Sequence, residues 1–220
     1  MQHQTDMFLT ADQDERLAIG PGAYCFKGAI TEDAYRILQA VEHVVAKAEF
    51  RHLTTPGGRR MSVAMSNCGQ QGWVSDHAGY RYQVTDPLTG QPWPVMPGIL
   101  LTKAQGLASR AGFDDFNPDV CLINRYRPGD RMGLHQDRDE GNVSAPIVSL
   151  SLGLPATFIW GGLQRTGPTQ RFLLEHGDAV VWGGEDRLRF HGVAPLKQGE
   201  HPLTKGCRIN ITFRQTGSLG

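Results

Sequence analysis

The chain lacks an excess of charge, because 22 Lys and Arg residues balance 22 Asp and Glu residues among its 220 residues. No overall positive field is therefore available to attract nucleic acid, and such a partner would have to be held by a local patch. No apolar run approaches the roughly 18 residues that a membrane span needs, and no secretory signal is recognisable. We expect a cytoplasmic protein without a membrane partner.

Cysteine is also scarce, and its spacing excludes two common kinds of site. The four cysteines, Cys25, Cys68, Cys121 and Cys207, lie far apart and form no C-x-x-C pair. This spacing argues against a structural zinc site and against a redox dithiol. Free thiols in a reducing compartment fit it best.

The first half of the chain carries the helical patterns. A chain of 220 residues fits one domain, residues 1–220, in which the polar residues 1–20 are expected to form a flexible tail. Apolar residues at helical spacing predict a helix near residues 32–48, with Thr31 as its N-cap. A second helix is predicted to begin at Pro97 and to end before Gly112.

The second half consists of short apolar runs separated by Gly, Pro and Asp. The runs are "VCLINRY", "APIVSLSLG", "ATFIWGG", "RFLLEHGDAVVWGG" and "CRINITFRQ". Because no long helical segment separates them, they predict a mainly β fold with flanking helices and an antiparallel double sheet as its core, about residues 118–215.

Between the two halves, about residues 50–95 combine Gly and Pro clusters with four aromatic residues, Trp73, Tyr80, Tyr82 and Trp93. Aromatic surface on irregular segments indicates a functional lid.

The stretch "LHQDRDE" contains a candidate metal site. His135 and Asp137 stand two residues apart, so they would face the same side of an extended segment. His191, which follows the predicted strand "RLRF", is the best candidate for a third ligand, because His3 falls in the tail and His43 in a predicted helix. Two histidines and one carboxylate form the facial triad of non-haem Fe(II) oxygenases. Alternatively, H-x-D arises by chance and His191 is an ordinary core histidine.

The run "CRINITFR" alternates between an apolar and a cationic face. Arg208, Asn210, Thr212 and Arg214 share one face, which is either a solvated outer face or a set of donors for carboxylates. Asn124 and Tyr126 in "LINRY" have matching parity and would line the same cavity. A carboxylate clamp beside an iron triad implies 2-oxoglutarate as the cosubstrate.

These motifs, together with "TPGGRRMSVAMSNCG" in the predicted lid, resemble the AlkB family of Fe(II)- and 2-oxoglutarate-dependent dioxygenases, in particular its bacterial alkylated-DNA repair enzymes. The resemblance extends from about residue 50 to residue 215. It implies a double-stranded β-helix, or jelly-roll, core with an N-terminal nucleotide-recognition lid. One position departs from the bacterial pattern, because Gly133 stands where a hydroxyl residue precedes the Leu-His pair.

The resemblance also implies the role of each site residue. Iron would be held by His135, Asp137 and His191, which are thereby the catalytic residues. Arg208 would pair with the distal carboxylate of 2-oxoglutarate and Arg214 with its chelating end, and Asn124, Tyr126 and Asn210 would complete that pocket. The damaged nucleotide would be contacted by Trp73, Tyr80, Asp139 and Arg165.

The activity implied is oxidative demethylation of N-alkylated bases, of the 1-methyladenine and 3-methylcytosine type, which consumes O₂ and releases formaldehyde and succinate. The expected partner of a monomeric enzyme is alkylated DNA, preferably single-stranded because a neutral chain has modest duplex affinity, with RNA as an open alternative. Two other functions stay open. One is an oxygenase acting on a protein or a small molecule, and the other is a non-catalytic jelly roll that binds nucleic acid or sugar.

Overall fold

The strands predicted in the second half form two facing sheets in the computed structural model, which describes residues 16–217. The larger sheet contains β1 (Arg16–Gly20), β2 (Ala23–Phe26), β3 (Arg51–Thr54), β4 (Arg60–Gly69), β7 (Val120–Tyr126), β9 (Ile147–Gly153), β12 (Ala179–Trp182) and β14 (Arg208–Arg214). The smaller sheet contains β8 (Met132–His135), β10 (Ala156–Trp160), β11 (Gln170–Leu174) and β13 (His191–Val193). A separate hairpin is formed by β5 (Gly72–Asp76) and β6 (Gly79–Gln83).

The strand order shows how the chain closes on itself. The larger sheet runs β1-β2-β12-β9-β14-β7-β4-β3, and the smaller runs β11-β10-β13-β8. Within both sheets, the strands of the described residues pair antiparallel. Strands distant in sequence are neighbours, as β14 is of β7 and β9. The predicted mainly β fold with a jelly-roll core is confirmed.

The alternation in β14 decides which residues face the space between the sheets. Ile209, Ile211 and Phe213 belong to the hydrophobic core beneath the helices, whereas Arg208 and Arg214 line the cavity between the two sheets. This is the period-two pattern of a strand that is covered on both faces. The cationic face is therefore not a solvated outer face, and both arginines are buried.

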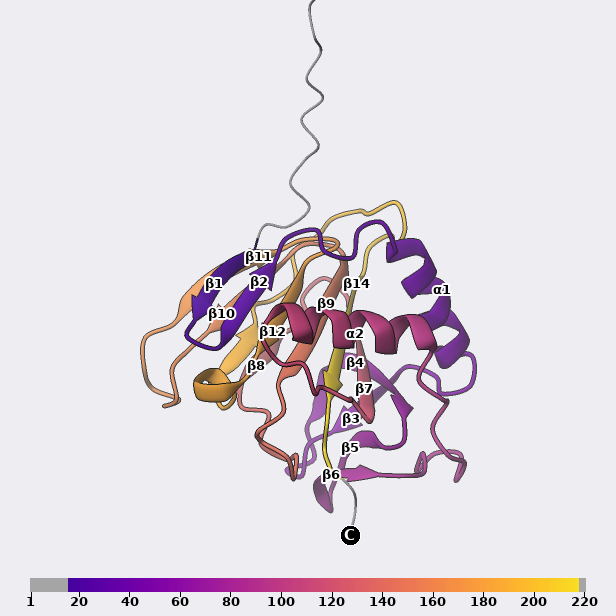
Figure 1. Ribbon diagram of the computed structural model, residues 1–220. Coiled ribbons are helices and arrows are strands. Elements are labelled where there is room, and N and C mark those ends of the chain that lie inside the picture. Colours follow the sequence, from indigo (N-terminus) through magenta and orange to yellow (C-terminus); the bar gives the residue numbers. More distant parts are fainter. Residues whose placement is uncertain (1–15, 218–220) are drawn as a thin grey trace, which may run out of the picture.

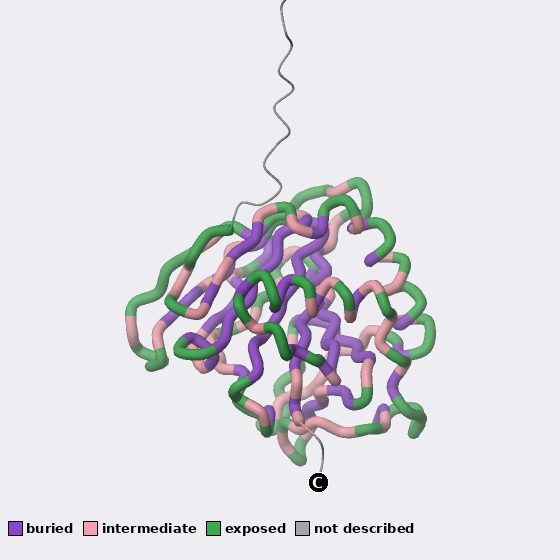
Figure 2. The backbone as a smooth tube through the Cα atoms, viewed as in Figure 1, coloured by how far each residue is buried: buried purple, intermediate pink, exposed green. Residues whose placement is uncertain are grey.

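Two helices cover the outer face of the larger sheet, as Figure 1 shows for α1 (Ala34–Val45) and α2 (Gly98–Arg110). Their buried apolar stripes pack against strands of that sheet, and the buried segments in Figure 2 are concentrated in the strands behind them. The second helix has Pro97 as its N-cap and Gly112 just after its last turn, with a φ of 91° at this glycine, as predicted. Within the described part of the chain, neither helix has the length and apolarity needed to cross a membrane.

The predicted N-cap of the first helix was wrong. The N-cap is Asp33, while the backbone N–H of Thr31 still donates to the carbonyl of Gly28 in a preceding turn. The side chain of Thr31 instead lies against Gly177, where an added Cβ would come within 2.0 Å of its hydroxyl oxygen. Thr31 therefore makes a tertiary contact with Gly177 instead of capping the helix.

Three other expectations need correction. The predicted tail ended at residue 20, but Arg16–Gly20 form β1 and pair with β2; residues 1–15, including the position of His3, lie outside the described residues. The predicted strand "RLRF", residues 187–190, is a turn and irregular chain that follows a short 3-10 helix, Gly184–Asp186, and the strand begins at His191. Trp93 is not a surface aromatic, because it is buried against Ala48 and Val74.

Candidate active site

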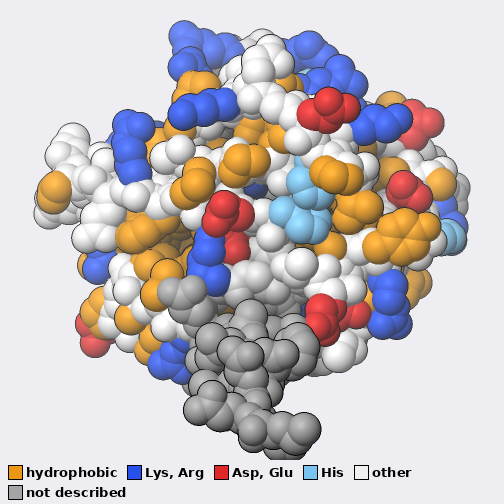
Figure 3. Space-filling view, turned by 90° about the horizontal axis from the view of Figure 1, so that it is seen from above, with side chains coloured by type: hydrophobic (Ala, Val, Ile, Leu, Met, Phe, Trp, Pro, Cys, Tyr) orange, Lys and Arg blue, Asp and Glu red, His pale blue; other side chains and the backbone are white. Residues whose placement is uncertain are grey.

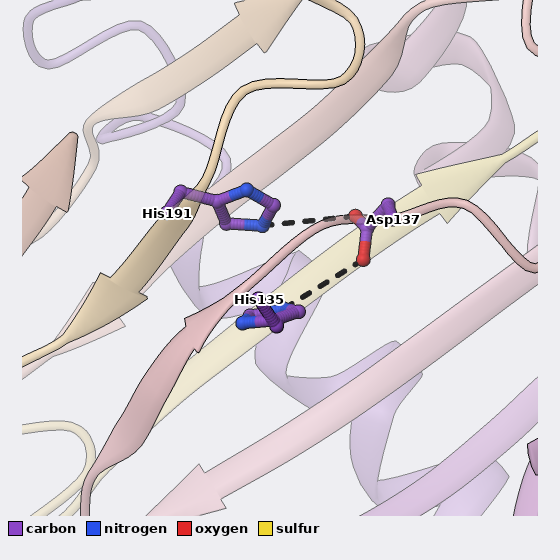
Figure 4. A group of neighbouring side chains, drawn as sticks. All are labelled: His135, Asp137 and His191. Atoms are coloured by element: carbon purple, nitrogen blue, oxygen red, sulfur yellow. Dashed lines mark ion pairs between the residues drawn. The ribbon is translucent and has the colours of Figure 1, made fainter. Parts of the chain in front are cut away.

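His135, Asp137 and His191 meet at one end of the smaller sheet (Figure 4). The nearest ligand atoms are His135 Nε2 and Asp137 Oδ1, 3.7 Å apart, and His191 Nε2 and Asp137 Oδ2, 3.8 Å apart. All three ligand atoms lie within 4.8 Å of one another. In Figure 4 both rings and the carboxylate point toward a common centre, so the three side chains are arranged to hold one metal ion.

Strand geometry brings these residues together. His135 is the last residue of β8 and His191 the first residue of β13, and they stand directly opposite each other in the antiparallel pair. Gly192 permits this close approach, because an added Cβ would lie 2.7 Å from the carbonyl oxygen of Met132. Asp137 follows two residues after His135, and its backbone carbonyl is held by Nη1 of Arg187 at 2.5 Å.

The hydrogen bonds of the two rings suit metal binding. Nδ1 of His135 donates to the carbonyl of Gly133 at 2.9 Å, and Nδ1 of His191 donates to the carbonyl of Arg189 at 3.0 Å. A carbonyl can only accept, so the proton stays on Nδ1 and Nε2 presents a lone pair toward Asp137. Oδ2 of Asp137 is buried without a hydrogen-bond partner, as expected of an atom that a cation would satisfy.

Burial and charge keep these groups in the protonation states that a metal requires. Burial, together with the neighbouring His135, lowers the pKa of His191 to about 4. Burial raises the pKa of Asp137, but Arg214, the two histidines and Arg187 together outweigh that effect and hold this pKa well below its usual range. A neutral imidazole and an ionised carboxylate at neutral pH are both ready to bind a cation.

A second group of side chains lies deeper in the same cavity and offers hydrogen-bond donors to an anion. Arg208 is 1% exposed, and its Nη2 donates to the hydroxyl of Ser151 at 3.0 Å. Its Nε and Nη1 are buried without partners, and its guanidinium lies 5.2 Å from the ring centre of Tyr126. Asn124 donates to Oδ1 of Asn210 at 3.3 Å. A buried cation with unpaired donors indicates an anionic ligand at this position.

Arg214 occupies the space between this pocket and the metal-binding triad. Its Nη2 donates to Oδ1 of Asp137 at 3.0 Å, and its Nε lies 3.1 Å from Oε1 of Glu140. Burial lowers the pKa of Arg214, but these two carboxylates and Tyr82 raise it, with a net shift upward. The guanidinium stays charged beside the metal-binding carboxylate.

The hairpin formed by β5 and β6 borders the mouth of the cavity. The rings of Trp73 and Tyr80 are stacked, with centroids 5.6 Å apart and planes at 13°. Nε1 of Trp73 donates to Oδ2 of Asp139 at 3.3 Å, and both guanidinium Nη atoms of Arg165 donate to the carbonyl of Leu134. Figure 3 shows the molecule from above Figure 1, opposite the end at which β5 and β6 lie, and there most Lys and Arg side chains lie toward the edges, with histidine and hydrophobic side chains between them.

All twelve residues predicted for the site line this one cavity, which has a volume of about 560 Å³. They are His135, Asp137, His191, Asn124, Tyr126, Arg208, Asn210, Arg214, Trp73, Tyr80, Asp139 and Arg165. The structure thus brings every one of them together, while the ligand of each stays a prediction.

The sequence analysis missed several residues of the site. Glu140 and Arg187 are both buried and form an ion pair of 3.1 Å next to the metal-binding triad. Met61 and Met65 of β4 also line the cavity. The parity of Met61, Met65 and Ser149 in their strands was a usable signal for the cavity face, whereas nothing in the local pattern singled out Glu140 or Arg187.

Comparisons with known proteins give a consistent result. The family model of the 2OG-Fe(II) oxygenase superfamily matches residues 22–214. The chain is 50% identical over 212 residues to the alpha-ketoglutarate-dependent dioxygenase AlkB of Escherichia coli, covering 96% of this chain and 98% of that protein. It is 44% identical over 203 residues to the AlkB homolog of Caulobacter vibrioides, covering 90% of each. Among solved structures, that of OsALKBH1 superposes with a TM-score of 0.79 at 27% identity and covers 91% of this chain and 100% of that one.

Proposed function

Because the chain belongs to the AlkB family within the 2OG-Fe(II) oxygenase superfamily, we propose that it is an Fe(II)- and 2-oxoglutarate-dependent dioxygenase that demethylates N-alkylated bases in DNA. The observation that carries this proposal is one cavity that holds a His-Asp-His cluster, two buried arginines and a stacked aromatic pair at its mouth. These three parts correspond to a metal, a dicarboxylate and a base.

The metal and cosubstrate are held by the inner half of the cavity. His135, Asp137 and His191 bind Fe(II), which with 2-oxoglutarate and O₂ supplies the oxidising chemistry and yields succinate and CO₂. Arg208 pairs with the distal carboxylate of 2-oxoglutarate and satisfies the donors now left buried without partners. Arg214 adjoins the chelating end, because it already contacts Asp137. Asn124, Tyr126 and Asn210 complete the pocket.

The outer half of the cavity selects the base. A base that leaves the helix loses its stacking, and the Trp73 and Tyr80 rings offer a replacement surface. Ring methylation of adenine or cytosine gives a cationic base that retains an exocyclic amine. The carboxylate of Asp139 attracts that charge and accepts a hydrogen bond from the amine, while Arg165 contacts the nucleotide backbone. The residues thus position the N-methyl group next to the metal, and oxidation of that group releases formaldehyde.

The preferred substrate is single-stranded alkylated DNA of the 1-methyladenine and 3-methylcytosine type, with RNA as a second substrate. Support comes from the neutral net charge, because a chain without a positive field binds a duplex only modestly. The enzyme works as a monomer in the cytoplasm, and the thiols of Cys68, Cys121 and Cys207 suit that reducing compartment.

The proposal is tested by incubating the purified chain with methylated oligomers, Fe(II), ascorbate and 2-oxoglutarate, and weighing the products. Single-stranded DNA, duplex DNA and RNA are compared, each carrying 1-methyladenine or 3-methylcytosine. We expect loss of one methylene mass with one formaldehyde and one succinate per repaired base, and no turnover by the His135→Ala variant. An equal succinate yield from that variant would refute the ligand assignment.

The second candidate is an oxygenase that acts on a protein or a small molecule. It has the same dependence on iron and 2-oxoglutarate. It gives no role, however, to the stacked rings of Trp73 and Tyr80 at the cavity mouth. Consumption of 2-oxoglutarate without demethylation of any of the six oligomers would favour it.

A further inference from the structure

Four buried charged side chains form a closed network beside the metal-binding triad. Glu140 places Oε2 3.1 Å from Nη2 of Arg187 and Oε1 3.1 Å from Nε of Arg214. Arg187 in turn donates to the backbone carbonyl of Asp137, and Arg214 donates to its carboxylate. Two cations thus hold Asp137 from its main chain and its side chain, and Glu140 is the second anion that balances them.

One side chain connects this network to the hairpin at the cavity mouth. The hydroxyl of Tyr82 in β6 donates to Oε1 of Glu140 at 2.5 Å. Tyr82 is the cross-strand partner of Trp73 in β5, which donates to Asp139. Two paired residues of the hairpin therefore hold two consecutive residues of the loop that follows the metal-binding Asp137.

The hairpin belongs to neither of the two sheets that carry the metal and anion sites. Its two strands form a sheet of their own, with no ladder to the strands of either larger sheet. The main packing contacts of β5 are with β3, β4 and β7 of the larger sheet, whereas β8 and β13 of the smaller sheet carry the two histidines. The side chains that touch residues 139 and 140 therefore give the hairpin a direct connection to the loop that follows the metal-binding Asp137.

We propose that Tyr82 and Glu140 are positioning residues. When the hairpin binds a nucleotide, they change the positions of Asp137 and Arg214, and substrate binding is thereby coupled to cosubstrate binding. This inference rests on the proposed function, since it takes the hairpin to contact the base. The physical reason is competition for Arg214. The Tyr82 hydroxyl supplies part of the hydrogen bonding of Glu140, and without it that carboxylate draws Arg214 away from Asp137.

The proposal predicts a linkage that can be measured without turnover. With Mn(II) in place of Fe(II) and without O₂, a nucleotide that seats the hairpin tightens the binding of 2-oxoglutarate, and 2-oxoglutarate tightens the binding of the nucleotide by the same factor. For the wild-type chain we expect about a fivefold or larger ratio between the dissociation constants of 2-oxoglutarate without and with a single-stranded oligomer carrying 3-methylcytosine.

The deciding variant is Tyr82→Phe, which removes one hydroxyl and keeps the ring. We expect the ratio to fall to about one, while the variant stays folded and still binds Mn(II). Tyr35→Phe is the matched control, because it removes the same atom from an exposed tyrosine on α1, and its ratio is expected to equal the wild-type value.

A second variant separates charge from shape. Glu140→Gln keeps the size of the side chain but leaves Arg187 and Arg214 with one carboxylate fewer. The ratio of the two dissociation constants should therefore fall to about one, and Mn(II) binding should weaken roughly tenfold. Its unfolding midpoint is measured first, and the Tyr82→Phe result decides alone if this variant does not fold.

The results that would overturn the proposal are a wild-type ratio of one, or a Tyr82→Phe variant that keeps the wild-type ratio. A purely structural role for Tyr82 would lower the unfolding midpoint and leave the ratio unchanged. Failure of the proposed function is seen separately, as the absence of formaldehyde in the aerobic assay with the wild-type chain.

Discussion

Arg208 offers the sharpest quantitative prediction, because its environment is that of a buried cation without an anion. The side chain is 1% exposed, it makes one hydrogen bond to Ser151, and two of its nitrogens have no partner. Each unsatisfied buried donor costs about 1–3 kcal/mol, so the site without a ligand carries a penalty of several kcal/mol. Replacement by Met, which is apolar and of similar length, removes that penalty. We expect Arg208→Met to be as stable as the wild type or more stable, by up to about 4 kcal/mol.

The same substitution should remove the binding of 2-oxoglutarate. Breaking a buried charge pair by removing one partner costs about 3–5 kcal/mol, which lowers affinity by roughly two to four orders of magnitude. At a concentration of 100 times its Kd, 2-oxoglutarate stabilises the wild-type fold by about 2.7 kcal/mol. For a chain of 220 residues this corresponds to a rise in Tm of roughly 5–11 °C.

The assay is thermal unfolding with Mn(II), in the presence and absence of 2-oxoglutarate. The wild type and the control Arg171→Met, at an exposed position of β11, should show the full rise in Tm. Arg208→Met should show none at the same concentration. A variant that retains the rise, or that unfolds far below the wild type without ligand, would refute the reasoning that Arg208 awaits a carboxylate.

Two further predictions concern selectivity and pH. Asp139→Asn should reduce the preference for cationic methylated bases over a neutral alkylated base by roughly tenfold in kcat/KM with Mn(II) affinity unchanged, and an unaltered substrate profile would contradict its role. Burial, together with the neighbouring His201, lowers the pKa of His176 below 6.5, so the unfolded chain binds this proton more readily than the folded chain. The stability that this histidine contributes is therefore present above pH 6.5 and lost as the pH falls through the folded-state pKa. In the His176→Asn variant, the free energy of unfolding, measured by urea titration, should fall less steeply with acidification than in the wild type. An unchanged slope would contradict the lowered pKa of His176.

The strand patterns were readable in advance because alternation is a local property. In β14, apolar residues at every second position mark one face and the polar residues between them mark the other, and the structure decided that this polar face is covered and not solvated. The same parity argument placed Asn124 and Tyr126 in the cavity. His135 and Asp137 could be paired from their spacing alone, because two residues separate neighbours on one side of an extended segment.

The third metal ligand shows where local reasoning reaches its limit. His191 was selected correctly as a member of the cluster, but for a wrong reason, since the segment "RLRF" before it is not a strand. What places His191 opposite His135 is the close approach of β13 to β8, which depends on the absence of a side chain at Gly192. Contacts between segments more than fifty residues apart leave no local pattern.

Composition and periodicity by themselves determined the β-rich core, the two helices, the paired ligands and the parity of the cationic strand. Only the tertiary structure decided that Arg187 and Glu140 are buried partners of Asp137 and Arg214, that Tyr82 reaches them from the hairpin, and that Trp93 is buried. The reason is that alternation and helical spacing follow from the backbone of one segment. A buried charge is stable only where side chains of other segments pair with it, and the fold of the whole chain decides which side chains those are.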